Sequence, residues 1–76
     1  MNNSKLELGR YQHYKGAFYE VVGIAVHSET REELVVYKAL YETPQFPINS
    51  LWVRPLSMFV ELITIEGQQV ERFRKI

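Results

Sequence analysis

The sequence predicts an all-β protein: a small five-stranded SH3-like barrel with one short 3-10 or helical turn near residues 55–59. Short runs rich in β-branched and aromatic residues recur along the chain, separated by breaks that contain Gly, Pro, Asn and Glu. No window longer than about ten residues has the 3.6-residue apolar period of a helix. The run Phe18–His27 is long, apolar on both faces and interrupted by Gly23. This pattern favours a bulged strand that bends and is shared by the two halves of a barrel.

The other strands expected in the first two thirds of the chain are shorter. The first, Arg10–Lys15, is closed by Gly16. The next is Leu34–Tyr41, which follows a polar break. The run Leu51–Arg54 ends at Pro55, because proline has no amide hydrogen to give to a ladder.

A helical turn and a hairpin are expected in the C-terminal third. Pro55–Phe59 can form a single turn, since proline suits the first helical position. Val60–Ile65 and Val70–Phe73 flank Glu66–Gln69, a short loop that contains glycine and so favours a hairpin. Thr43–Ser50 contains two prolines and is expected to be a loop.

The chain is expected to form one domain, residues 9–76, after a flexible N-terminal lead-in, residues 1–8. Its 76 residues are 46% hydrophobic, which is typical of a globular protein. It has no cysteine, so disulfides, thiolate metal sites and cysteine nucleophiles are excluded. No apolar run approaches the roughly 18 residues of a membrane helix, and the start has no apolar signal region. We therefore expect a soluble cytoplasmic protein with no membrane partner.

Nine Lys and Arg balance nine Glu, so the formal net charge is zero. Nucleic-acid binders usually carry a basic excess, because neutralising phosphates supplies much of their affinity. The only dense basic stretch, residues 72–75, also adjoins Glu71. Nucleic acid is therefore not the expected partner.

Ordered blocks of the sequence closely resemble a bacterial family catalogued as domain of unknown function 1653. The resemblance covers about Gly9 to Phe73 and implies a small standalone bacterial protein with a compact β fold and no established activity. Glu71 stands where proline is expected, which affects the geometry of the last strand. The blocks that carry the resemblance are Gly9–Gly16, Tyr19–Val21, Ala25–Thr30, Val35–Tyr37, Leu40–Tyr41, Trp52–Pro55, Met58–Phe59, Glu61, Gly67, Val70 and Arg72–Phe73.

The most polar candidate for a binding site is the loop His27, Ser28, Glu29 and Thr30. Loops on a rigid scaffold often contact ligands. The other interpretation is a hairpin connection in which Ser and Thr bond to local amides. A catalytic triad is not expected, because adjacent residues of an extended chain point to opposite faces.

A second candidate is the pair Trp52 and Arg54, which share one face of a strand. The planar guanidinium group suits a carboxylate or phosphate. The alternative is a structural ion pair with Glu20 or Glu61. Absence of a partner carboxylate would favour the anion site.

The chain also has ten aromatic residues, five of them tyrosines. Tyrosine is favoured in grooves, because an apolar ring carries a polar hydroxyl. We therefore add Tyr14 and Tyr37 to the candidate face, although most of the rings are expected in the core. His13 and His27 are the only histidines and lack metal-site spacing, so no metal and no cofactor is expected.

The preferred function is a non-enzymatic binding module. Its recognition face would combine the loop from His27 to Thr30 with Tyr14, Tyr37, Trp52 and Arg54, and its ligand would be a small anionic molecule or a short peptide. One alternative is a small hydrolase or isomerase that uses His27 with Glu29 or Glu61. Another is weak binding of single-stranded RNA on stacked aromatics. Assembly into a homo-oligomer is left open.

Overall fold

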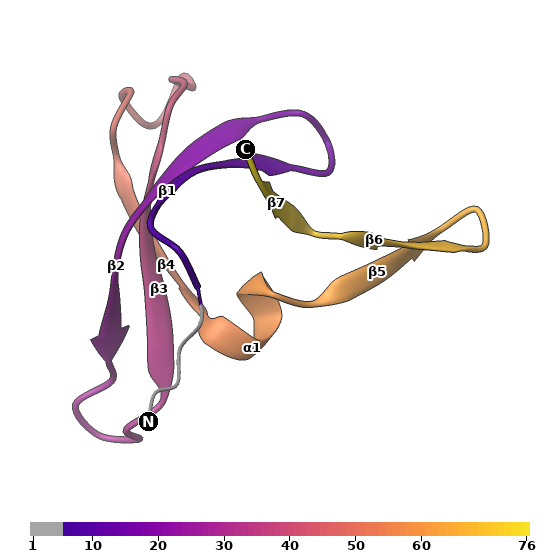
Figure 1. The fold of residues 1–76 in the computed structure, drawn as a ribbon. Coiled ribbons are helices and arrows are strands. Elements are labelled where there is room, and N and C mark those ends of the chain that lie inside the picture. The colour runs from indigo at the N-terminus through magenta and orange to yellow at the C-terminus, as the bar shows by residue number, and fades with distance from the viewer. Residues whose placement is uncertain (1–5) are drawn as a thin grey trace.

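The computed structural model describes residues 6–76, which form seven strands and one short helix (Figure 1). The all-β class is confirmed, and so is the helical turn expected near residues 55–59. No helix in this part of the chain is long and apolar enough to cross a membrane. The elements are β1 (Gly9–His13), β2 (Phe18–Val26), β3 (Glu33–Ala39), β4 (Leu51–Pro55), α1 (Leu56–Phe59), β5 (Leu62–Ile65), β6 (Gln68–Glu71) and β7 (Phe73–Lys75).

Five of the strands form one antiparallel sheet in the order β4-β3-β2-β1-β7. A single barrel of five strands was expected, whereas residues 6–76 form seven strands in two sheets. Within residues 6–76 the sheet has two edges, β4 and β7, and is strongly curved rather than closed (Figure 1). The chain between these edges forms α1 and then the separate hairpin β5–β6, so it adds no strand that would join β4 to β7.

The bend of β2 is located at the expected glycine. The register between β2 and β3 shifts between Val21 and Gly23, which confirms the predicted irregularity. Before the shift Val21 is buried, and after it Ile24 packs against the core. The change of parity explains why both faces of the run are apolar in the sequence.

The ring of Phe73 is at the centre of the core. It stacks on Phe59 of α1, with centroids 4.1 Å apart and planes at 5°. The rings of His13, Tyr19 and Tyr37 lie 4.9, 5.6 and 5.8 Å from it. Phe73 therefore joins β7 to α1, β1, β2 and β3. The buried hydrophobic residues are Tyr11, Val21, Val35, Tyr37, Ala39, Phe59 and Phe73.

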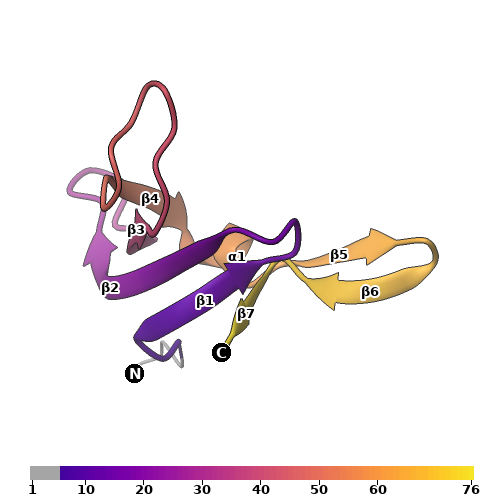
Figure 2. The same cartoon turned by 90° about the horizontal axis from the view of Figure 1, so that it is seen from above.

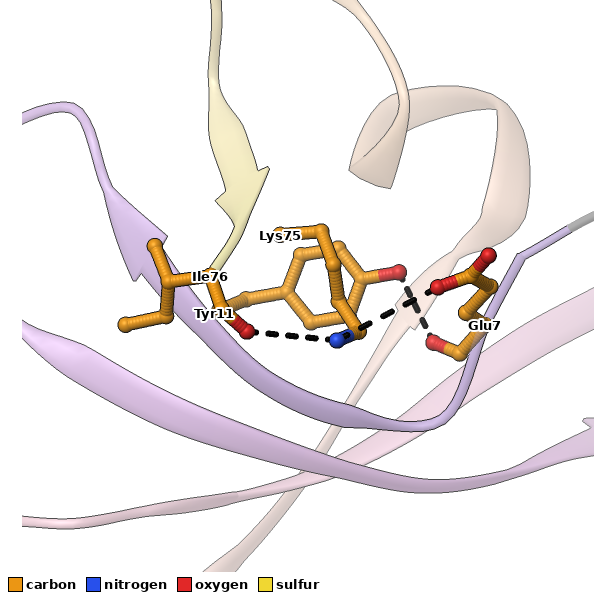
Figure 3. Close-up of polar contacts among 4 residues, drawn as sticks. All are labelled: Glu7, Tyr11, Lys75 and Ile76. Carbon is orange, nitrogen blue, oxygen red and sulfur yellow. Dashed lines mark hydrogen bonds and ion pairs between the residues drawn. The ribbon is translucent and has the colours of Figure 1, made fainter.

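The segment before β1 is attached to the same core (Figure 3). Leu6 packs against the buried cluster, and the Tyr11 hydroxyl donates a 2.7 Å hydrogen bond to the Glu7 carbonyl oxygen. The Lys75 ammonium group lies 4.0 Å from the Glu7 carboxylate. Part of the predicted flexible lead-in thus has defined contacts from Leu6 onward, whereas residues 1–5 lie outside the described structure.

The hairpin β5–β6, which we call the arm, projects from the main sheet (Figure 2). It confirms the hairpin expected around Glu66–Gln69. Glu66 and Gly67 form its two-residue turn with φ of +50° and +82°, the signs of a type I′ turn. The single strand expected over Val70–Phe73 is divided at Arg72, which lies between the end of β6 and the start of β7.

We expect Phe73→Leu to lower the free energy of unfolding by about 2 kcal/mol, because it removes ring contacts and leaves a cavity. Denaturant unfolding followed by circular dichroism measures the change. Phe18→Leu is the matched control, because it is the same substitution in the same sheet at a residue that is 43% exposed. Equal losses in the two variants would contradict the central role of Phe73.

We expect Glu66→Asn to stabilise the arm, because Asn-Gly is the preferred pair for a type I′ turn. Asparagine avoids part of the roughly 1–2 kcal/mol that a left-handed conformation costs other residues. Amide hydrogen exchange in β5 and β6 should become slower. Gly67→Ala should have the opposite effect, and identical exchange in both variants would refute the assigned turn.

Candidate functional site

Arg54 is a cation on an aromatic surface. Strand β4 places it directly opposite Val35, so it lies on the core side of the sheet. Its Cζ atom is 5.5 Å from the centroid of Phe73, a cation–π geometry. The side chain is half-buried, and its Nε atom is buried without a hydrogen-bond partner.

The structure gives Arg54 no carboxylate. Across residues 6–76 the ion pairs are Arg72 with Glu61, at 3.3 Å, and Lys75 with Glu7. Glu61, one of the two partners considered for Arg54, is thus occupied by Arg72. The other, Glu20, is opposite Lys38 and belongs to the outer face of the sheet. Among residues 6–76 the alternative considered for Arg54, a structural ion pair, is not formed, which favours the anion-site interpretation.

His13 is a hydrogen-bond donor close to Arg54. It ends β1 opposite Phe73, and its Nδ1 atom accepts a 3.2 Å hydrogen bond from the Lys15 amide. The neutral ring therefore carries its hydrogen on Nε2. Burial, followed by the charges of Arg72, Arg54 and Lys15, lowers the pKa of His13 below its ordinary value of 6.5. At neutral pH the ring is an uncharged donor in a positive local field.

Tyr19 and Tyr41 are a hydrogen-bonded pair, and Tyr19 is close enough to Arg54 for its charge to affect the Tyr19 pKa. Their hydroxyl oxygens are 2.7 Å apart, and their rings meet edge to face. Burial, followed by the hydrogen bond with Tyr41, raises the pKa of Tyr19, whereas the Arg54 charge acts in the opposite direction. The Tyr19 hydroxyl is thus protonated at neutral pH. One hydrogen is used within the pair, and the other is free for a further acceptor.

We call the Arg54 site the group formed by Arg54, His13 and Tyr19, which surround Phe73, and by Tyr41, which contacts Tyr19. Its members come from β4, β1, β2 and the segment after β3. They are arginine, neutral histidine and tyrosine, so hydrogen-bond donors dominate and no carboxylate is included. Such a set suits the oxygens of a carboxylate or phosphate.

Three residues of the face predicted from sequence are neighbours on β3 and β4. Tyr37 is opposite Trp52, and Arg54 follows on the same face. Tyr37 is only 6% exposed, so it contributes packing. The Trp52 indole donates to the Ser50 hydroxyl at 3.0 Å and packs edge to face on Phe46 at 4.8 Å. Trp52 is thus held against the loop that precedes β4.

The remaining residues of the predicted face lie at opposite ends of β2. The segment His27–Thr30 follows β2, whereas Tyr14 belongs to the turn that precedes it (Figure 1). His27 Nδ1 accepts bonds from the amides of Glu29 and Thr30, at 3.1 and 3.3 Å. Of the bonds expected in a hairpin connection, Thr30 makes one, because its Oγ1 atom accepts from the Glu32 amide at 3.2 Å, whereas Ser28 is exposed. The fold therefore does not bring the loop and Tyr14 to one surface.

Tyr14 instead lines a hollow of about 710 Å³ between the turn after β1 and the arm. Ile65 and Val70 supply its apolar side, and Arg74 its cation. His13 also lines it, so this residue belongs both to the hollow and to the Arg54 site.

Sequence reasoning did not assign His13, Tyr19 or Tyr41 to the site. The sequence pattern indicates the face of the first two. His13 is two positions from the buried Tyr11, and Tyr19 is two positions from the buried Val21, so each shares the core face of its strand. Alternation alone does not say which strands are neighbours. Tyr41 follows the end of β3 and had no such signal.

Two findings relate this chain to known proteins. A family model described as a protein of unknown function (DUF1653) matches residues 9–75. A crystal structure of a DUF1653 protein from Bordetella bronchiseptica is 30% identical, with a TM-score of 0.83, and the match covers 95% of this chain and 88% of that one. No curated protein matches. The sequence match and the shared fold agree: the chain belongs to the DUF1653 family.

Proposed function

We propose that this domain is a non-enzymatic binding module that recognises a carboxylate or phosphate group of a small ligand at the Arg54 site. The observation that carries the proposal is a half-buried arginine on an aromatic ring with no carboxylate within 4.0 Å among residues 6–76. Removing a charge from water without a partner is costly, so an external anion would stabilise this arrangement.

A short peptide is the second form of ligand that fits. Its terminal carboxylate would be bound by the same donors. The exposed rings of Phe46 and Trp52 would offer apolar surface on the same side of β4. A chain without cysteine suits a reducing compartment, and the proposal therefore includes a cytoplasmic location.

The other candidate functions receive no specific support. A general base at His27 would have to break the bonds that its Nδ1 atom accepts from the turn. Glu61, one of its candidate partners, is paired with Arg72. RNA binding would lack the affinity that an excess of basic residues supplies, because the net charge is zero.

The first test uses benzoate and phenyl phosphate, which each join an anion to a ring. In amide NMR titrations both should shift signals around Arg54, His13 and Tyr41. Arg54→Met keeps the aliphatic stem but removes the charge, and should weaken binding about tenfold to a hundredfold. That range corresponds to the roughly 1.5–3 kcal/mol of a hydrogen bond to a charged group.

Arg10→Met is the matched control for this experiment. Arg10 is opposite Glu20 on the outer face of the same sheet, so its loss should leave the affinity unchanged. Benzyl alcohol, a neutral compound of similar size, should cause no shifts at the site. Equal affinity in wild type and in a folded Arg54→Met variant would refute the proposal.

The affinity should also rise as the pH falls from 8 to 5.5. The pKa of His13 is low because burial and the cations Arg72, Arg54 and Lys15 disfavour its charged form. A bound anion favours that form and raises the pKa, so binding takes up a proton and strengthens at lower pH. The proton goes to Nδ1, which then loses its hydrogen bond from the exposed Lys15 amide.

His13→Gln should flatten this dependence without abolishing binding, because Arg54 remains. His27→Gln removes the other histidine, in the distant loop, and should keep the wild-type profile. Titrations with phenyl sulfonate, whose charge does not change over this pH range, separate protein from ligand ionisation. A wild-type profile in the His13 variant would contradict the role given to this ring.

A further inference from the structure

Strand β4 is an edge of the main sheet. Its pairing with β3 shows which of its backbone amides and carbonyls form hydrogen bonds within the sheet. The Ala39 amide donates to the Ser50 carbonyl oxygen at 3.0 Å, just before β4 begins. In an antiparallel ladder, bonded positions recur at every second residue. Trp52 and Arg54 therefore direct their amides and carbonyls to β3.

By the same alternation, Leu51 and Val53 direct their backbone groups away from β3. Within residues 6–76 no strand lies on that side. The two side chains are 65% and 59% exposed, so an apolar edge with free donors and acceptors faces solvent. Pro55 occupies the next outward position and ends the edge, because it has no amide hydrogen.

We propose that this edge pairs with β4 of a second copy of the chain, antiparallel about a twofold axis at Val53. In that register Val53 is opposite itself and exchanges backbone hydrogen bonds with its copy. Leu51 is opposite Pro55 of the partner subunit and donates to its carbonyl oxygen. Trp52 is opposite Arg54 of the partner subunit.

The occupant is a second copy because β4 complements itself at every position. On the outer face Leu51, Val53 and Pro55 meet only apolar side chains. On the inner face each Trp52 meets an arginine that has no carboxylate partner, an arrangement suited to a cation–π contact. Identical patches that contact each other in this way are the requirement for a twofold dimer.

The dimer would place an indole of one copy beside the Arg54 site of the other. The proposal does not depend on anion binding, because it rests on the backbone edge and on side-chain complementarity. Its test contains no ligand, so either proposal can fail alone.

The position of Val53 on the axis allows a charge-pairing experiment. Val53→Lys and Val53→Glu each place like charges opposite each other and should reduce the mass from that of a dimer to 9.0 kDa. An equimolar mixture of the two variants should restore the dimer. Light scattering after gel filtration measures the mass. The control is Val26→Lys, because Val26 in β2 is also 59% exposed, and it should remain dimeric.

Hydrogen exchange of the wild type provides a second readout that needs no variant. The amides of Leu51 and Val53 should exchange slowly at high protein concentration, and faster on dilution below the dissociation constant. Two results would overturn the proposal. One is a 9.0 kDa mass at millimolar concentration with fast exchange of both amides. The other is a dimer that survives Val53→Lys.

Discussion

The packing of the Phe73 ring is the contact on which the rest of the structure depends. A chain of 76 residues with no disulfide has little apolar surface to bury, so its few large rings must do most of the packing. Phe73 contacts Phe59 of α1, His13 of β1 and Tyr19 of β2 at once. It also belongs to the strand that returns after the arm, and so it fixes the C-terminal segment to the first half of the chain.

The same ring positions the candidate site. Arg54 lies over Phe73 on the side of the cluster that includes Tyr19, and its charge reaches both His13 and Tyr19. Fold and site are therefore not independent: a change that moves Phe73 also moves the guanidinium group. Substitutions at Arg54 that keep its aliphatic stem are the ones that separate binding from stability.

Local patterns predicted most of the fold. Gly23 within a run apolar on both faces predicted the irregularity of β2, and Pro55 predicted the start of the helical turn. The open sheet and the projecting arm depend on which distant strands become neighbours, and no residue of β5 or β6 carries that information. For the site, Arg54 was predicted from alternation along one strand. His13 and Tyr41 come to the Arg54 site only because four strands pair side by side. Tyr14 and the loop after β2 are kept apart by the length of β2, which has nine residues.

The central claim is that Arg54 binds an anionic ligand, and the most direct measurement observes its guanidinium group. Side-chain NMR resolves the Nε–H signals of the five arginines in the ¹⁵N-labelled protein. On addition of phenyl phosphate, the signal of Arg54 should shift and saturate while that of Arg10 stays in place. Equal small shifts of all five signals, or none at Arg54, would contradict the account.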